Sequence, residues 1–306
     1  MSLTTTYRAN GKLLLTGEYL VLHGAKAVAL PLEVGQRLEV SFPNYTQAIV
    51  WQAFYHEALW FSCELSPADF SIQTTSDPEK AESLARILKT IQAINPTFNI
   101  EAGTLLKTTL ESNPEWGFGS SSTLISLLSQ FSGVDAFRLN ELAFQGSGFD
   151  IACATANGPI LYQRGSSVEQ VSPDYPFSDR LCLVYSGKKK STAGEVNAFL
   201  KEMKVSAELV DEMSELSQRF LMCRDQNEFN QLIRSHEAMI GNLIGRKTLK
   251  SEFFTDFDGE IKSLGAWGGD FFLASSSKWT FEQVKKYFAN KGLPTAFKWD
   301  DLILKR

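Results

Sequence analysis

The stretch Pro114-Glu115-Trp116-Gly117-Phe118-Gly119-Ser120-Ser121-Ser122 runs into the apolar series Leu124, Leu127, Leu128 and Phe131. Two glycines, three hydroxyls and apolar residues at helical spacing predict a tight glycine loop that enters a helix N-terminus. The first turn of such a helix has unpaired N–H groups and the positive end of the helix dipole, so it binds phosphate readily. Taken alone, the pattern also fits a flexible link with Ser120 or Ser121 as helix cap.

The composition is that of a folded globular protein. Of 306 residues, 43% are hydrophobic and 21% are charged, which is ordinary for globular domains. This length predicts two domains, each with its own core. The formal net charge of -5 argues against nucleic acid as a partner, because that binding requires a basic surface excess.

Cysteine usage and apolar runs bear on the compartment. Cys63, Cys153, Cys182 and Cys223 are scattered and never form Cys-x-x-Cys, so neither a zinc site nor a disulfide framework is predicted. Gly17-Glu18 interrupts the apolar run near the N-terminus, and no apolar stretch has transmembrane length. We expect a cytoplasmic protein that does not bind membranes, and the sequence is compatible with a homodimer.

The first part of the chain is rich in strand patterns. Residues 37–42, 49–55 and 58–65 alternate or are rich in aromatic residues, which favours an antiparallel sheet. Asp77-Pro78 then predicts a helix start, and Pro96 predicts its end.

A composition shift at residues 173–176 predicts a domain boundary near residue 177. Beyond it lie a strand pattern at 181–185, a basic turn from Gly187 to Thr192 and several helical patterns. A third glycine-rich turn, at residues 265–270, leads into a further apolar strand pattern. There is no internal repeat.

Several common site patterns are missing. The sequence has no Gly-x4-Gly-Lys-Ser/Thr, no Gly-x-Gly-x-x-Gly placed after a strand, and no His-Glu-x-x-His. No nucleophile triad can be assembled from its spacing. P-loop, Rossmann, metalloprotease and hydrolase interpretations are therefore poor.

Four segments stand in a fixed order. They are Gly11-Lys12-Leu13-Leu14-Leu15-Thr16-Gly17-Glu18-Tyr19 with Leu22-His23-Gly24, the glycine-serine loop, Gly146-Ser147-Gly148-Phe149-Asp150-Ile151-Ala152, and Gly265-Ala266-Trp267-Gly268-Gly269-Asp270. Together they resemble the GHMP kinase superfamily, which holds galactokinase, homoserine kinase, mevalonate kinase and phosphomevalonate kinase. The similarity is greatest to its phosphomevalonate kinase and mevalonate kinase branch.

The resemblance implies an α+β fold of two domains. Residues 1–177 would form the N-terminal nucleotide-binding domain, similar to domain 2 of ribosomal protein S5. Residues 178–306 would form a ferredoxin-like C-terminal domain, with the active site in the cleft between the two.

By the same resemblance, the protein transfers the γ-phosphoryl group of ATP to phosphomevalonate or mevalonate, with Mg²⁺ as the metal. Such a transfer needs positioning and charge stabilisation more than covalent chemistry. The glycine-serine loop would hold the ATP phosphates, and the Ser121 hydroxyl would ligate Mg²⁺. The phosphate-binding residues would be Gly117, Gly119, Ser120, Ser121 and Ser122.

Asp150 and Lys12 match the catalytic positions of the family. Asp150 would orient or deprotonate the acceptor hydroxyl. Lys12 would keep that carboxylate ionised and neutralise charge in the transition state. Without the resemblance, Asp150 also fits a helix N-cap, and Lys12 fits a solvated charge at a strand end.

Six further residues would contact the acceptor. Glu18 fits equally well a residue that satisfies its own turn, and the last glycine turn fits an ordinary strand entry. Lys188 to Lys190 suit an anion clamp, and Glu141 suits a Mg²⁺ ligand. A solvated surface charge is the better explanation for Glu141 and for at least two of the three lysines. The six acceptor contacts would be Glu18, Gly148, Gly265, Ala266, Gly268 and Gly269.

Trp116 and Trp267 stand where the family has small residues. Indoles beside phosphate loops would narrow or reshape a nucleotide site. Two alternatives therefore stay open. One is a kinase for another hydroxyl compound, a sugar or an amino-acid alcohol. The other is a protein that binds a nucleotide or metabolite without turnover.

Overall fold

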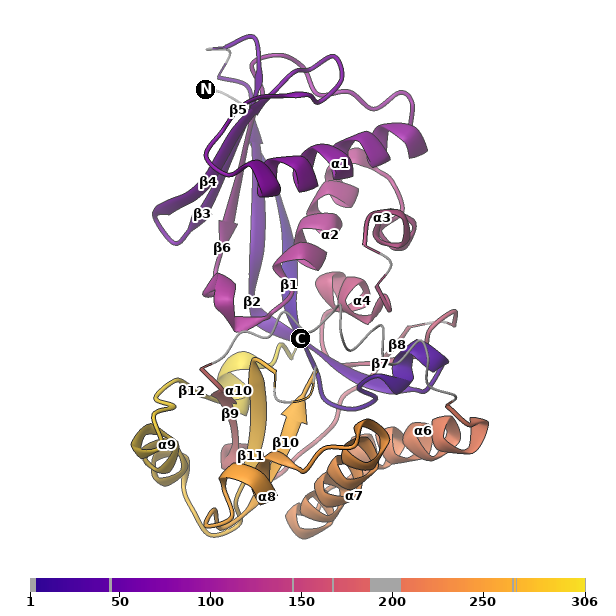
Figure 1. The fold of residues 1–306 in the computed structure, drawn as a ribbon, viewed down its shortest axis with the longest axis vertical. Helices are drawn as coiled ribbons and strands as arrows, with labels where there is room; N and C mark the ends of the chain where they lie inside the picture. Colours follow the sequence, from indigo (N-terminus) through magenta and orange to yellow (C-terminus); the bar gives the residue numbers. More distant parts are fainter. Residues whose placement is uncertain are drawn as a thin grey trace. The chain divides into compact units, whose positions relative to one another are not determined.

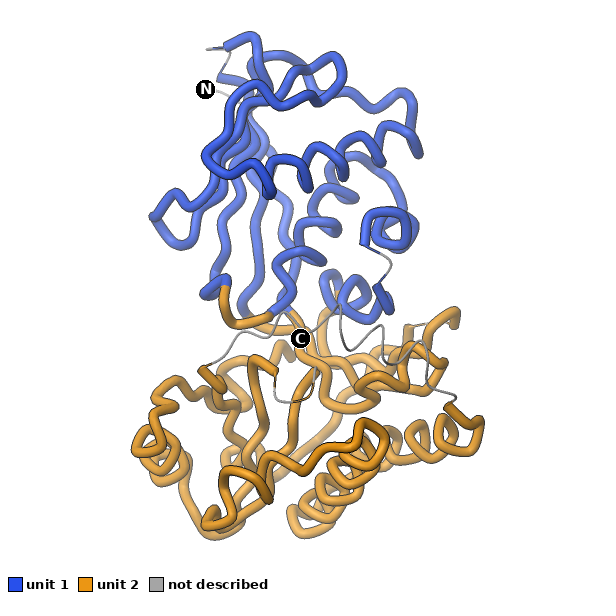
Figure 2. The backbone as a smooth tube through the Cα atoms, in the orientation of Figure 1, with its two compact units in different colours: residues 1–11, 34–114, 118–155 blue, residues 12–33, 115–117, 156–306 orange. Residues whose placement is uncertain are grey.

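The computed structural model (Figure 1) describes residues 4–43, 46–144, 146–166, 168–187, 205–265, 267 and 269–305. Its contacts divide the chain into two compact units (Figure 2). Unit 1 comprises residues 1–11, 34–114 and 118–155, and unit 2 comprises residues 12–33, 115–117 and 156–306. Each unit is made of three separate segments of the chain, so the units are not divided at one residue. The domain boundary near residue 177 stays a prediction.

Strands and helices come partly in runs along the described chain, as is typical of an α+β fold. In order they are β1 (Thr5–Leu14), η1 (Leu20–His23), β2 (Ala27–Ser41), β3 (Ile49–Tyr55), β4 (Ala58–Leu65), β5 (Ile72–Thr75), α1 (Pro78–Ile94), β6 (Leu105–Leu110), η2 (Pro114–Trp116), α2 (Ser120–Ser132), α3 (Ala136–Ala143), α4 (Phe149–Thr155), β7 (Ile160–Tyr162), β8 (Glu169–Gln170), η3 (Ser178–Arg180), β9 (Leu181–Tyr185), α6 (Ala207–Met222), α7 (Gln226–Ile244), α8 (Leu249–Phe253), β10 (Glu260–Leu264), β11 (Phe271–Ser275), α9 (Phe281–Asn290), β12 (Ala296–Lys298) and α10 (Trp299–Leu302).

The larger sheet has the strand order β5-β4-β3-β6-β2-β7-β8, with β1 paired to β2. Most neighbours are antiparallel, as the alternating strand patterns predicted. The pair β3 and β6 is parallel, with Trp51 opposite Leu106. The reason is the connection: the chain passes through β4, β5 and α1 before it returns as β6.

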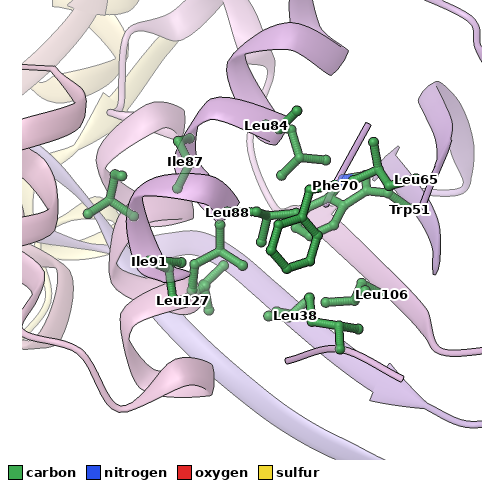
Figure 3. Close-up of a cluster of buried hydrophobic side chains, with 14 of the residues drawn as sticks. Leu38, Trp51, Leu65, Phe70, Leu84, Ile87, Leu88, Ile91, Leu106 and Leu127 are labelled. Carbon is green, nitrogen blue, oxygen red and sulfur yellow. The ribbon is translucent and has the colours of Figure 1, made fainter. Parts of the chain in front are cut away.

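Helix α1 supplies much of the core of unit 1. Its N-cap Asp77 accepts a hydrogen bond from the Lys80 N–H, and Pro78 occupies the first turn, so the predicted helix start is confirmed. In Figure 3, Leu84 and Leu88 from this helix lie with Trp51 from the sheet. The spacing of these leucines puts them on one helical face, and that face is buried.

Helix α2 begins at Ser120 and ends before Gly133, whose φ of 72° is left-handed. Its start agrees with the sequence prediction. Helix α4 was not predicted, because residues 152–156 are small and show no helical apolar period. The turn at Gly148 is followed at once by this short helix, and its Ile151 and Cys153 are buried.

The smaller sheet lies in unit 2, with the order β10-β11-β9-β12 and antiparallel neighbours throughout. The chain runs from β9 through α6 and α7 to β10, then to β11, α9 and β12. This is the split β-α-β arrangement of ferredoxin-like domains. The predicted class of the second domain is therefore confirmed.

None of the helices within the described ranges combines the length and the apolar character that crossing a bilayer requires.

Candidate active site

The N-terminus of α2 is open to solvent. Gly119 precedes the helix with φ 88° and ψ 42°, a left-handed conformation that suits glycine, and its carbonyl accepts the Thr123 N–H at 2.9 Å. Ser120 and Ser121, which follow it, are exposed. Their main-chain N–H groups belong to the first helical turn, where N–H groups have no partner within the helix. This end of α2 thus has the properties of an anion site.

The third serine of the loop has a different role. Ser122 is 2% exposed, and its hydroxyl donates to the Gly119 carbonyl at 2.8 Å. Next to it, the Thr123 hydroxyl donates to Gln36 Oε1 at 2.7 Å and ties α2 to β2. The Ser122 hydroxyl therefore stabilises the turn, whereas Ser120 and Ser121 are exposed to solvent.

A cavity of about 190 Å³ lies beside Ser120 and Ser121. Trp60 from β4 and Phe144, just after α3, give it aromatic walls, and both side chains are 38% exposed. Lys80 also lines it, with its Nζ 5.4 Å from the centre of the Trp60 ring. This cavity was not predicted from the sequence, where the aromatic residues of β4 are a signal for it.

Gly117 is counted with unit 2. Its φ is 65°, and a Cβ atom there would lie 1.6 Å from Asp270 Oδ2. Glycine is therefore required at this position by both conformation and space.

Trp116 packs on the smaller sheet of unit 2. Its ring centre lies 5.1 Å from that of Phe297 and 6.2 Å from that of Phe271, both edge-on, and Tyr185 is a further neighbour at 6.4 Å. The indole does not line the cavity beside Ser120. The predicted reshaping of a nucleotide site by Trp116 is thus not seen at that cavity.

Gly148 and Asp150 lie where α4 begins. Gly148 is buried, and its φ is 94°. Asp150 sits in the first turn of α4, partly buried, and its Oδ1 accepts the Ile151 N–H at 3.2 Å. The contact with its own neighbour leaves Oδ2 for other partners, so a local and a chemical role are compatible.

Lys12 lies in β1 and is partly buried. It belongs to unit 2, whereas Asp150 belongs to unit 1. Each residue is positioned by regular secondary structure: Lys12 by a strand and Asp150 by a helix. Rigid elements of this kind hold side chains more precisely than loops do.

Glu18 lies in a buried charge cluster that the sequence did not reveal. Glu18 Oε1 accepts from Lys262 Nζ at 2.8 Å, and its Oε2 lies 2.9 Å from His236 Nε2. Glu237 accepts from the Ser263 N–H and hydroxyl, each at 3.1 Å. All four side chains are at most 3% exposed. We call Glu18, His236, Glu237 and Lys262 the buried charge cluster.

The electrostatics of the cluster favour a charged Glu18. Burial acts to raise the pKa of its carboxyl group, but the Lys262 ammonium and His236 outweigh that effect, and the pKa is held below its ordinary value of 4.5. Glu18 is 2% exposed, and both of its carboxylate oxygens lie against buried charged partners. Its contacts favour the structural role for Glu18 over the expected substrate contact.

The last glycine turn follows β10. Gly265 has a φ of 71°, and Gly269 is buried. Trp267 is 6% exposed and packs in an apolar cluster with Leu20 and Ile240, so its indole fills the interior of unit 2. The predicted contacts at Ala266 and Gly268, and the basic residues 188–190 with Ser191 and Thr192, lie outside the described residues.

The described residues hold no group of three or more His, Cys, Asp or Glu side chains placed to bind a metal ion together. Glu141 is paired with Arg138 at 2.7 Å, and its side chain is 67% exposed, which agrees with a solvated helix face. Ser121 keeps an exposed hydroxyl.

Comparisons of the sequence with known proteins give no match, whereas comparisons of the structure do. No protein-family model matches the chain, and a comparison with curated proteins gives no match either. Solved structures match it over almost its full length. Mevalonate kinase from Methanococcus jannaschii aligns with a TM-score of 0.72 at 13% identity, over 100% of this chain and 99% of its own.

Two further structures show the same likeness. Streptococcus pneumoniae phosphomevalonate kinase, in complex with phosphomevalonate and AMPPNP, aligns with a TM-score of 0.69 at 18% identity, over 96% and 99% of the two chains. Lactococcus lactis galactokinase, complexed with galactose, gives 0.65 at 12% identity, over 96% and 92%. The chain therefore has the fold of these kinases, and the fold predicted from the sequence resemblance is confirmed.

Proposed function

We propose that this protein is an ATP- and Mg²⁺-dependent kinase that phosphorylates phosphomevalonate or mevalonate. One observation carries the proposal: exposed Ser120 and Ser121 at the N-terminus of α2 border a cavity of about 190 Å³ with aromatic walls. A nucleotide needs a place for an anionic chain and a place for a flat base. The phosphomevalonate kinase of the same fold was solved with AMPPNP, which supports this interpretation.

The residues present fit a nucleotide. The first-turn N–H groups of α2, with the hydroxyls of Ser120 and Ser121, would hold the phosphates. Trp60 and Phe144 would contact the base. Gly119 would keep the approach to the phosphates clear of a side chain, and the main chain of Gly117, beside Asp270, would complete the loop. The Ser122 main chain would contribute, while its hydroxyl stays bonded to Gly119.

Mg²⁺ fits this site through Ser121. Magnesium takes oxygen ligands, keeps several waters, and is usually held by substrate phosphates together with few protein groups. An exposed hydroxyl beside the proposed phosphate site suits that chemistry. When bound, the metal would neutralise phosphate charge.

Asp150 and Lys12 would act on the acceptor. The Asp150 carboxylate would accept or orient the proton of the acceptor hydroxyl, and the Lys12 ammonium would stabilise the charge of the transferred group. Main-chain groups at Gly148, Gly265, Ala266, Gly268 and Gly269 would line the acceptor site. In this proposal the boundary between the two family domains falls near residue 177 of the sequence. The protein would act in the cytoplasm and would bind neither nucleic acid nor membranes.

A different hydroxyl acceptor is the second candidate, because the galactokinase complexed with galactose has the same fold. Acceptor choice depends on the shape of the acceptor site and not on the phosphate machinery. Binding without turnover has less support, since Trp116 and Trp267 pack within unit 2 and neither lines the aromatic cavity.

ADP release with phosphomevalonate, mevalonate, homoserine and galactose tests the proposal. We expect turnover with phosphomevalonate or mevalonate, and a kcat about 10²- to 10⁴-fold lower for Asp150→Asn. Asp135→Asn is the matched control, because Asp135 caps α3 in the same unit and asparagine caps equally well. Titration with Mg²⁺ and AMPPNP gives binding separately.

Each outcome has a distinct meaning. Binding of AMPPNP without ADP release from any acceptor would identify a nucleotide-binding protein. Turnover of galactose or homoserine alone would favour the second candidate. An Asp150→Asn protein with the parental rate would remove Asp150 from the mechanism.

A further inference from the structure

Tyr19 has an unusual main-chain conformation. Its φ is 65° and its ψ is -49°, and among the described non-glycine residues only His56 and Phe70 also have a positive φ. Such a conformation costs about 1–3 kcal/mol, so it persists only where surrounding contacts impose it. The contacts of Tyr19 show what is gained in return.

The Tyr19 hydroxyl holds the last glycine turn. It accepts the main-chain N–H of Trp267 at 2.6 Å, and the bond is buried. Burial is the main cause that raises the pKa of Tyr19, so the neutral phenol is the form present near neutral pH. The bond connects two segments that lie far apart in the sequence but within the same unit.

Trp267 is anchored a second time through its side chain. The indole N–H donates to the Lys247 carbonyl at 3.3 Å, and the ring packs with Tyr19, Leu20 and Ile240. Gly241 on α7 lies beside the ring, and a Cβ atom there would be in ordinary contact with it at 3.7 Å but only 2.8 Å from the Arg246 carbonyl oxygen. The indole therefore fixes one point of the turn in the interior of unit 2.

The residue before Tyr19 holds the strand that enters the same turn. Glu18 accepts from Lys262 of β10 at 2.8 Å, with both side chains at most 2% exposed. Two consecutive residues thus hold the turn at two points: Glu18 at the strand that leads into it, and Tyr19 at Trp267 within it.

We propose that Tyr19 and Trp267 form a latch that positions the last glycine turn for the acceptor, with Glu18 and Lys262 as its base. The inference rests on the proposed function for the acceptor role of this turn. Tyr19 and Trp267 are positioning residues, since they act through the main chain of the turn. The aromatic cavity, Ser120 and Ser121 belong to unit 1, and Gly117 lies against Asp270, three residues beyond Trp267, so nucleotide binding should change much less than acceptor binding.

Tyr19→Phe removes only the hydroxyl. Its matched control is Tyr175→Phe, which removes a buried hydroxyl of the same unit that donates to the Phe220 carbonyl at 2.8 Å. We expect Tyr19→Phe to speed amide exchange in residues 265–271 about five- to tenfold, as the loss of one hydrogen bond implies. Tyr175→Phe should not change exchange there. Trp267→Phe keeps the hydrogen bond from its main-chain N–H to the Tyr19 hydroxyl but loses the indole bond to Lys247. It should speed amide exchange in these residues less than Tyr19→Phe and more than Tyr175→Phe.

Kinetics then test the role of the latch. Tyr19→Phe should raise the KM for the acceptor about tenfold, while the Kd for AMPPNP with Mg²⁺ stays within about twofold of the parent. Equal exchange in Tyr19→Phe and Tyr175→Phe would overturn the latch. Faster exchange with an unchanged acceptor KM would overturn its positioning role.

The two hypotheses fail separately. Amide exchange requires no substrate, so it decides whether the latch exists even if no acceptor is phosphorylated. Absence of turnover in the parent protein would count against the proposed function alone.

Discussion

Two of the glycine-rich turns of this protein, the one before α2 and the one after β10, have opposite surroundings. The turn before α2 leaves Ser120 and Ser121 exposed beside an aromatic cavity. The turn after β10 is anchored by buried side chains. Trp267 within the turn is 6% exposed, and Lys262 in the preceding strand β10 is fully buried. The first turn is accessible, and the second is anchored.

The difference teaches how such turns become binding sites. Glycine permits left-handed main chain in both, at Gly119 and at Gly265. A helix start then offers N–H groups to a ligand. The turn after β10 instead depends on neighbours for its position, and the buried charge cluster beneath it supplies part of that support.

The largest expected effect concerns this support. Lys262→Met leaves the carboxylates of Glu18 and Glu237 buried without their shared cation. Removing one partner of a buried ion pair costs about 3–5 kcal/mol. We expect the free energy of unfolding, measured in urea, to fall by that amount.

Lys278→Met is the control for this substitution. Lys278 pairs with Asp258 at 3.0 Å, but its side chain is 71% exposed, and surface pairs are worth about 0–1 kcal/mol. An equal loss of unfolding free energy in the two variants would mean that the buried charge cluster contributes no more to stability than an exposed ion pair does.

An intermediate effect is expected at the accessible turn. Trp60→Ala removes an aromatic wall of the cavity beside Ser120. Because stacking of a base on an aromatic ring contributes about 1–3 kcal/mol, the Kd for AMPPNP should rise about 5- to 150-fold. Titration calorimetry measures it.

Phe137→Ala serves as the matched control. Phe137 is 43% exposed in the same unit, close to the 38% of Trp60, but it does not line the cavity. If both substitutions weaken nucleotide binding alike, the cavity is not the base site.

The smallest effect concerns pH. The pKa of Glu18 is held below 4.5 in the folded protein, so its contribution to stability is complete above pH 4.5 and is lost as the pH falls through the folded pKa. Glu18→Gln should therefore flatten the decline of unfolding free energy in that acid range. The slope should differ from the parent by at most about 1.4 kcal/mol per pH unit.

Urea unfolding at a series of acid pH values measures this slope. Glu141→Gln, at an ion pair with a 67% exposed carboxylate, should leave the slope unchanged. A parental slope in Glu18→Gln would show that this carboxylate does not contribute to the acid sensitivity of the fold.

Local features were predictable from the sequence because their causes are local. Asp77 and Pro78 fix the start of α1, and Gly133 ends α2. The short helix α4 was missed, because its small residues Ala152 and Ala154 show no clear amphipathic period. Predictions for Lys12 and Asp150 came from the family resemblance, and their roles stay predictions.

By itself the sequence determined the glycine turns and the main helices, since dihedral freedom, capping and apolar period are properties of neighbouring residues. The α+β fold was predicted from the family resemblance. Only the tertiary structure decided which turn is open. Glu18 is more than 200 residues from its cluster partners His236, Glu237 and Lys262 in the sequence. No local sequence pattern predicts that these side chains lie together. Burial of charge and the space beside Ser120 arise from packing between distant segments, which spacing along the chain does not encode.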